Sequence, residues 1–171
     1  MFDLVDADDR PSDIAFVQGD IRNAARVAEA VAGCDTVYHC VAQVPLAKDK
    51  ALFRSVNVNG TENLLLAALA AKVRKVIYVS SSAVFGAPKS NPVTEETPPT
   101  PGEAYGRAKL AGEKLCRAYA AQGLDVTIIR PRTIMGHGRL GIFQILFEWI
   151  PAGKIAAREP GIRAAEAVAQ S

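Results

Sequence analysis

KVIYVSSS (residues 75–82) is the stretch that decides the fold. Most of its first five residues are apolar, which predicts a parallel β-strand that is buried on both faces. After a long Pro-rich loop, EAYGRAKLAGEKLCRAYAAQG (103–123) carries apolar residues at helical spacing and closes with Gly123. LDVTIIRP (124–131) then predicts another buried strand. Strand, helix and strand in this order indicate a βαβ unit in a parallel sheet.

The same alternation extends toward the amino terminus. DIAFVQGD (13–20) and DTVYHCVA (35–42) predict two more strands, and the helical pattern of RNAARVAEAVAGCD (22–35) between them stops at Gly33. A long helical pattern, DKALFRSVNVNGTENLLLAALAAK (49–72), leads into KVIYVSSS. The sequence therefore predicts an α/β fold with one doubly wound, Rossmann-like parallel sheet.

The two ends of the chain differ from this pattern. MFDLVD (1–6) resembles the last residues of a strand, so we expect the sheet to be incomplete at its N-terminal edge. Residues 1–150 are predicted to form the partial Rossmann-like domain. Residues 151–171 are rich in Ala, Arg, Gly and Pro and have no buried-strand pattern. They are either an atypical tail, disordered or helical, or a sequence foreign to the fold.

Composition excludes several classes of function. The 171 residues suit a single domain with one core. The chain is 49% hydrophobic and 22% charged with a net charge of +2, so no electrostatic reason exists to expect a nucleic-acid partner. No apolar stretch approaches the roughly 20 residues of a membrane helix, and the N-terminus is acidic, unlike a secretory signal. We expect a cytoplasmic protein without a membrane span.

The sequence predicts no metal site. Cys34, Cys40 and Cys116 are too widely separated for a disulfide framework or a C-x-x-C site, and we expect buried free thiols. His39 and His137 are too few and too far apart to indicate metal ligation. Because His39 lies in an apolar run, we expect a core histidine with satisfied hydrogen bonds.

Residues with chemical potential lie in the middle of the chain. Tyr105 and Lys109 are four apart, so on a helix both project from one face. A nearby ammonium favours the phenolate and brings a tyrosine into range as a general acid or base. Ser80, Ser81 and Ser82 end a predicted strand, where ligands bind in open α/β sheets. Alternatively, the pair decorates a solvated helix and the serines cap a turn.

Five motifs occur in a characteristic order: GDIRN (19–23), NVNGTENLL (57–65), VSSSAVFG (79–86), YGRAK (105–109) and IIRP (128–131). Together they closely resemble the extended short-chain dehydrogenase/reductase family of the NAD-dependent epimerase/dehydratase type. Its members include nucleotide-sugar epimerases, dehydratases and 3β-hydroxysteroid dehydrogenases. The resemblance covers about residues 1–150 and implies that they form a partial NAD-binding domain.

The resemblance implies three catalytic residues. Ser81 stands five residues before Gly86, the position of the family's catalytic Ser or Thr, and would hydrogen-bond the reacting oxygen. Tyr105 would act as general acid or base on a substrate hydroxyl or carbonyl. Lys109 would hold the nicotinamide ribose and lower the pKa of Tyr105.

The resemblance also implies an NAD site. Asp3, at the end of the family's second strand, would accept hydrogen bonds from the adenosine ribose and favour NAD over NADP. Asp20 and Ile21 match the pair beside the adenine. The remaining cofactor-binding positions are a strand end, a loop beside the nicotinamide, and the catalytic pair: Cys40, Val41, Ala42, Gln43, Thr133, Tyr105 and Lys109.

GHGRLG (136–141) fits the pattern G-x-G-x-x-G, but it follows the last predicted strand and no βαβ unit comes after it. We interpret its glycines as loop residues. The family's glycine-rich loop is expected upstream of Met1, and the substrate domain is expected to be missing too. These expectations predict a truncated enzyme that keeps the catalytic trio but binds NAD poorly.

The substrate is less well defined by the sequence. Ser82 and Ala83 stand where dehydratases carry Asp-Glu, which argues against a 4,6-dehydratase. An epimerase or dehydrogenase for a nucleotide sugar is the favoured interpretation. A 3β-hydroxysteroid-type dehydrogenase with a sterol-like substrate is an alternative, and so is a non-catalytic binding or regulatory protein on the same fold. The family often dimerises through the helix that carries Tyr105; in a homodimer, Leu110, Leu115 and Tyr119 could serve that contact or face the sheet instead.

Overall fold

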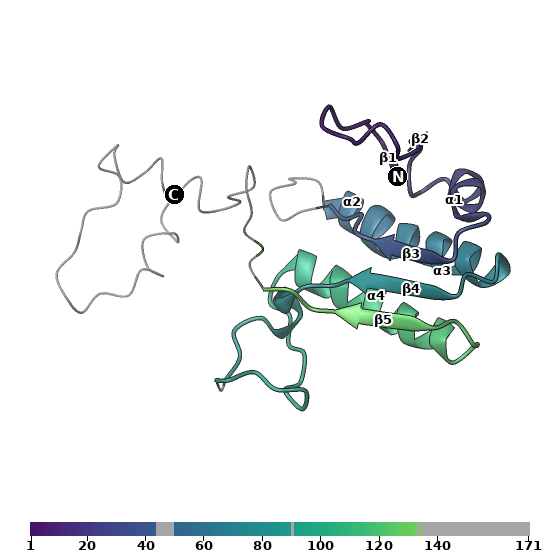
Figure 1. Cartoon of the computed structure of the whole chain (residues 1–171). Helices are drawn as coiled ribbons and strands as arrows, with labels where there is room; N and C mark the ends of the chain where they lie inside the picture. The colour runs from purple at the N-terminus through teal and green to yellow at the C-terminus, as the bar shows by residue number, and fades with distance from the viewer. Residues whose placement is uncertain (44–49, 90, 133, 135–171) are drawn as a thin grey trace, which may run out of the picture. The chain divides into compact units, whose positions relative to one another are not determined.

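The computed structural model describes residues 1–43, 50–89, 91–132 and 134, and the element order alternates strands with helices (Figure 1). The strands are β1 (Phe2–Asp3), β2 (Val17–Gln18), β3 (Thr36–His39), β4 (Lys75–Val79) and β5 (Val126–Ile129). The helices are α1 (Ala24–Val31), α2 (Lys50–Arg54), the π-helix η1 (Ser55–Gly60), α3 (Thr61–Ala70), the 3-10 helix η2 (Ser82–Phe85) and α4 (Ala104–Ala120). The predicted Rossmann-like α/β pattern is confirmed.

The strands form two parallel sheets, whereas the sequence predicted one. β1 pairs with β2, and β3, β4 and β5 form a second sheet in that order. Between the two sheets lies a cavity of about 330 Å³, lined by Phe2 and Val17 on one side and by Val37 and Tyr38 on the other. Among the described residues no strand pairing joins β1 or β2 to β3.

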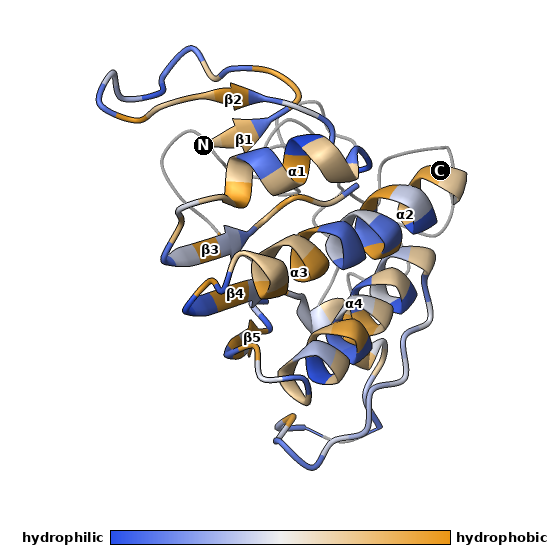
Figure 2. Ribbon diagram, turned by 90° about the vertical axis from the view of Figure 1, so that its right-hand side faces the viewer, coloured by the Kyte–Doolittle hydropathy of each residue, from blue (hydrophilic) through white to orange (hydrophobic). Residues whose placement is uncertain are grey.

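One face of the larger sheet is covered by helices. Val76 and Tyr78 of β4 are 0% and 1% exposed, and Leu65 of α3 is 0% exposed. Figure 2 shows α3 and α4 lying across the strands on this side. Tyr38 and Ile129 remain 68% and 42% exposed. The expectation that these strands are buried on both faces is therefore wrong for β3 and β5 in the described part of the chain, because their alternate side chains meet no covering helix.

The helix boundaries follow local chemistry. Asn23 caps α1 by accepting a hydrogen bond from the Arg26 N–H at 3.2 Å. Gly33 and Gly123 have φ values of 77° and 100°, the left-handed conformation in which glycine readily ends a helix. Both helix ends were predicted at these glycines. The long helical pattern before β4 is likewise confirmed, since α2, η1 and α3 follow one another without a break.

None of the helices in the described part of the chain combines the length and the apolar character needed to cross a bilayer. The predictions for residues 151–171, Thr133, His137 and GHGRLG (136–141) lie outside the described residues.

Candidate functional site

The site is built where α4 crosses the carboxyl end of β4. Tyr105 and Lys109 lie one turn apart on α4, as their spacing predicted. Gly106, between them, brings the first turn of α4 against the backbone of Ala83, since a Cβ at this glycine would overlap the Ala83 carbonyl oxygen. Close approach at this point places Tyr105 beside Ser81, which precedes η2.

Lys109 is a buried cation. Its side chain is 2% exposed, and its Nζ donates a hydrogen bond to the Val79 carbonyl at 2.8 Å. The same nitrogen lies 5.2 Å from the centre of the Tyr78 ring and 5.9 Å from that of Tyr105. Burial lowers the pKa of Lys109 to about 8, although the Cys40 and Cys116 thiols act in the opposite direction. The ammonium is therefore charged at neutral pH but loses its proton far more readily than an exposed lysine.

Tyr105 is half-buried, and its ionisation differs from the prediction. Burial raises the pKa of Tyr105, and a hydrogen bond with the Ser81 side chain offsets this only in part. The expected lowering by Lys109 is not seen: its ammonium lies over the ring and donates to Val79. Tyr105 is thus a neutral phenol at neutral pH in this structure.

Ser81 is placed by the turn that follows β4. Its Oγ accepts a hydrogen bond from the Ala83 N–H at 3.1 Å, so Ser81 caps η2. The predicted alternative, in which the serines cap a turn, is therefore correct for Ser81. Capping uses one lone pair and leaves the hydroxyl proton for another partner.

Seven of the predicted cofactor-binding residues line one cavity of about 430 Å³. They come from β1, the turn after β2 and the segment after β3: Asp3, Asp20, Ile21, Cys40, Val41, Ala42 and Gln43. Leu52 and Val56 contribute apolar walls. The carboxyl ends of neighbouring parallel strands thus converge on one concave surface, the usual position of a ligand in such sheets.

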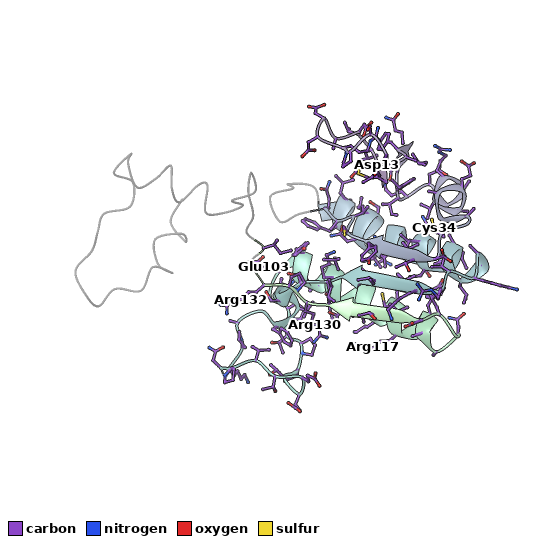
Figure 3. The ribbon with its side chains drawn as sticks, viewed as in Figure 1. Asp13, Cys34, Glu103, Arg117, Arg130 and Arg132 are labelled. Carbon is purple, nitrogen blue, oxygen red and sulfur yellow. The ribbon has the colours of Figure 1, made fainter. Side chains whose placement is uncertain are left out.

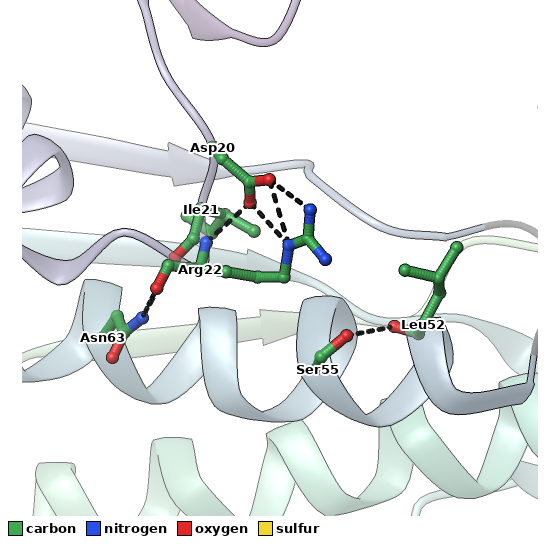
Figure 4. Close-up of polar contacts among 6 residues, drawn as sticks. All are labelled: Asp20, Ile21, Arg22, Leu52, Ser55 and Asn63. Carbon is green, nitrogen blue, oxygen red and sulfur yellow. Dashed lines mark hydrogen bonds and ion pairs between the residues drawn. The ribbon is translucent and has the colours of Figure 1, made fainter.

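Polar contacts fix the rim of this cavity (Figure 4). Arg22 donates to both carboxylate oxygens of Asp20 at 2.5 to 3.0 Å, and this bonding lowers the pKa of Asp20. Asp3 accepts the N–H of Leu4 at 2.7 Å. Both residues line the cavity, and their side chains keep unused acceptor sites.

Two asparagines hold the cavity backbone in place, and neither was predicted. Asn57 is 1% exposed; it accepts the Gln43 N–H at 2.6 Å and donates to the Gln43 carbonyl at 3.0 Å. Asn63 donates to the carbonyl of Ile21 at 3.1 Å. Both lie in the quoted motif NVNGTENLL. Their spacing of six residues gave no reason to expect that they hold opposite sides of one cavity, because their partners are distant in sequence.

His39 is buried, as predicted, but its hydrogen bonds are only partly satisfied. Its Nε2 lies 2.8 Å from the hydroxyl of Thr61, which itself donates to the Asn57 carbonyl. Among the described residues Nδ1 has no partner. Burial, together with the charge of Lys109, lowers the pKa of His39 to about 3. The ring is neutral and unsuited to proton transfer at neutral pH.

The prediction of buried thiols holds for only one of the three cysteines. Cys116 is 0% exposed, and burial raises the pKa of its thiol to about 12. Cys34 and Cys40 are free and exposed, because each lies at the end of an element rather than in the interior.

A buried ionic cluster behind the site was also not predicted. Glu113, two turns after Tyr105 on α4, is 0% exposed and receives hydrogen bonds from Ser80 and Arg130. The helical pattern of residues 103–123 did not distinguish it from an exposed helix charge. Leu115 and Tyr119 are partly buried and pack against the core.

Comparisons with known proteins identify close similarities. The family model described as "NAD dependent epimerase/dehydratase family" matches residues 4–150. The uncharacterized protein y4nG of Sinorhizobium fredii is 53% identical over 90% of this chain and 39% of its own length. The N-acetyl-alpha-D-glucosaminyl-diphospho-ditrans,octacis-undecaprenol 4-epimerase of Escherichia coli O157:H7 is 36% identical over 80% of this chain and 42% of its own length.

Two further similarities bear on the site. The 3-beta-hydroxysteroid dehydrogenase of Mycolicibacterium neoaurum is 33% identical over 83% of this chain and 42% of its own length. The crystal structure of UDP-glucuronic acid 4-epimerase from Bacillus cereus in complex with NAD aligns with a TM-score of 0.67 and 34% identity, over 74% of this chain and 41% of that one. The chain thus spans about two fifths of the length of these relatives.

Proposed function

Since the chain belongs to the NAD dependent epimerase/dehydratase family, we propose that it carries the NAD-binding and proton-transfer parts of a nucleotide-sugar epimerase or dehydrogenase. The observation that supports this most is the cavity that Asp3, Asp20 and the segment from Cys40 to Gln43 share. Ser81 follows the carboxyl end of β4, and Tyr105 and Lys109 lie on α4 beside that end.

The cavity offers polar groups for the adenosine half of a dinucleotide. Asp3 would accept hydrogen bonds from the adenosine ribose hydroxyls, which favours NAD over NADP. Asp20 and Ile21 would border the adenine, with Asn63 holding the Ile21 carbonyl in place. Asn57 fixes the backbone of Gln43 along the cavity. When bound, NAD supplies the hydride acceptor for the reaction.

The chain's own residues would manage the proton. In the oxidation, for which NAD would accept the hydride, Tyr105 as its phenolate would take the proton of the substrate hydroxyl. In the reverse reduction the neutral phenol, the form present in this structure, would return that proton to the carbonyl oxygen. Ser81 would donate a hydrogen bond to the same oxygen. Lys109 uses one of its three N–H donors on Val79 and has two left for ribose hydroxyls.

Two relatives favour different substrates. The 34% identity with the UDP-glucuronic acid 4-epimerase supports a nucleotide sugar. The 36% identity with the Escherichia coli enzyme supports 4-epimerisation of a sugar held on a diphosphate, which in that relative is linked to undecaprenol. The 33% identity with a 3-beta-hydroxysteroid dehydrogenase over 83% of this chain supports a sterol-like substrate as the second candidate. We keep the nucleotide sugar as the proposal because two of the three relatives compared above that have a stated activity are sugar 4-epimerases.

The test compares Tyr105→Phe with Tyr119→Phe on the same helix. NAD binding and turnover of UDP-glucose, UDP-N-acetylglucosamine and a 3β-hydroxysterol would be measured on the 171-residue chain. Loss of a general acid–base residue lowers the reaction rate about 100-fold or more. Tyr105→Phe should therefore lower turnover by this factor and leave the affinity for NAD at the wild-type value. Tyr119→Phe, which packs against the core, should retain both.

Other outcomes assign other functions. Turnover of the sterol alone would transfer the proposal to the second candidate. NAD binding without turnover of any substrate would favour a binding protein on the same fold. Turnover that Tyr105→Phe leaves unchanged would contradict catalysis by Tyr105.

A further inference from the structure

Glu113 is a fully buried carboxylate held by two segments of the sheet. Ser80 Oγ donates to Glu113 Oε1 at 2.6 Å. The guanidinium of Arg130 donates through Nε to Oε1 at 2.8 Å and through a terminal nitrogen to Oε2 at 2.6 Å, the bidentate geometry of strong Arg–carboxylate pairs. Burial opposes ionisation, but these hydrogen bonds outweigh it and lower the pKa of Glu113. The carboxylate is charged at neutral pH.

The two donors come from the strand ends that border the site. Ser80 directly precedes Ser81, and Arg130 directly follows β5 (Figure 3). Backbone bonds run in the same place: Ser80 N–H donates to Ile129 at 2.8 Å and Ser82 N–H to Pro131 at 2.9 Å. The Glu113 carboxylate on α4 thus bonds to the residues that follow the carboxyl ends of both strands.

The helix side of the contact is equally specific. Tyr105, Lys109 and Glu113 recur every four residues and form one stripe of α4. Lys109 bonds the Val79 carbonyl, one residue before Ser80. Arg130 also lies with its guanidinium 5.0 Å from the centre of the Phe85 ring in η2, the turn that Ser81 caps. The cluster touches every segment that carries a proposed catalytic residue.

We propose that Glu113 is a positioning residue, which clamps the ends of β4 and β5 to α4 and so sets Ser81 opposite Tyr105 and Lys109. This inference deepens the proposed function and rests on it. Loss of the clamp would let α4 move away from Val79 and Ser80, and water would then reach Lys109.

The test follows the ionisation of Lys109 by NMR titration of lysine side-chain signals in the labelled 171-residue chain, without NAD or substrate. The wild-type pKa is expected at about 8. In Glu113→Gln, hydration of the ammonium should raise this pKa by about one unit or more, toward its ordinary value. Loss of the negative charge alone would lower the pKa of a nearby ammonium, so a rise reports the change of position.

Matched variants separate positioning from stability. Arg117→Gln removes an exposed cation that also approaches Glu113, at 3.6 Å with 60% of its side chain exposed, and should leave the pKa of Lys109 unchanged. Ser80→Ala keeps the ion pair and should give a smaller rise in the same direction. It also replaces Glu113→Gln as the decisive variant if the latter does not fold.

An unchanged pKa of Lys109 in the variants that fold, accompanied only by a lower melting temperature, would overturn the inference and leave Glu113 as a stabilising ion pair. The titration does not depend on turnover. If Tyr105→Phe retains activity while the pKa of Lys109 responds to Glu113→Gln, the catalytic proposal fails and the clamp stands.

Discussion

At the scale of single residues, burial decides which groups carry charge. Glu113 keeps its charge because Ser80 and Arg130 surround it, whereas His39 is equally buried but receives no compensating anion. Because the Thr61 hydroxyl donates to Asn57, it must accept from His39 Nε2. Nδ1 is then an unprotonated nitrogen, without a partner among the described residues. Protonating it would place an unpaired cation in the interior.

His39 should therefore make the protein sensitive to mild acid. Its pKa is about 3 in the folded chain and near its ordinary 6.5 in the unfolded one. Between these values only the unfolded state takes up the proton, so stability falls as the pH drops below 6.5. We expect the wild type to lose up to about 1.4 kcal/mol per pH unit relative to His39→Gln between pH 6.5 and 5. The free energy of unfolding of both proteins would be measured by urea titration at each pH. An equal change with pH in the two proteins would contradict a lowered pKa for His39.

For the candidate site, the sequence predicted which residues lie together better than it predicted their interactions. Seven proposed cofactor-binding positions line one cavity, and Tyr105 and Lys109 share a helix face. Those predictions came from the order of the five motifs and the family resemblance that it indicates. Glu113 and Arg130 escaped notice because they are 17 residues apart, and only the folded chain brings them together. The pKa of Tyr105 was predicted in the wrong direction, since charge was considered without burial.

At the scale of elements, a glycine in α4 allows this helix to pack closely against β4. Gly112 faces the hydroxyl of Tyr78, which is 1% exposed and approaches the Lys109 carbonyl at 3.4 Å. A Cβ at Gly112 would overlap that hydroxyl. The helical spacing predicted α4 accurately, but the small residues that set its distance from the strand were not recognisable without the partner they face.

Gly112→Ala should therefore destabilise the chain although alanine favours helices. The gain in helix propensity is about 1 kcal/mol, while overpacking a core costs about 1–3 kcal/mol, so we expect a net loss in the free energy of unfolding. Adding Tyr78→Phe removes the nearer of two overlaps, that with the hydroxyl, but leaves the ring carbon Cζ 2.7 Å from the new Cβ, so it should restore part of the loss. Gly102→Ala, whose Cβ would meet nothing within 4 Å, is the control. Denaturant midpoints of the four proteins test this; no rescue by Tyr78→Phe would show that the overlap is not the cause.

At the scale of the described molecule, local pattern predicted the elements and non-local pairing decided the sheets. Apolar runs and helical spacing identified the strands and helices in the correct order. They could not show that β1 and β2 pair with each other, with partners 15 residues apart, and stay apart from β3, because pairing depends on which edges meet in space. The smaller sheet has two residues in each strand, and the larger sheet has four or five.

This difference in size predicts unequal local stability. The amides of Val17 and Gly19 bond across the smaller sheet at 2.8 and 2.9 Å, and those of Val76 and Ser80 bond across the larger sheet at 2.8 Å. Because these bond lengths are nearly equal, a difference in exchange rate between the two sheets would reflect packing and not hydrogen-bond geometry. Val76 is 0% exposed beneath the helices, whereas Val17 borders the open cavity, so its bond should open without unfolding the rest of the chain. Hydrogen exchange resolved by NMR should show Val17 and Gly19 exchanging through local opening, at least about 100-fold faster than Val76 and Ser80 and with little dependence on denaturant. Equal protection at all four amides, with the same denaturant dependence, would instead show that the two sheets unfold as a single cooperative unit.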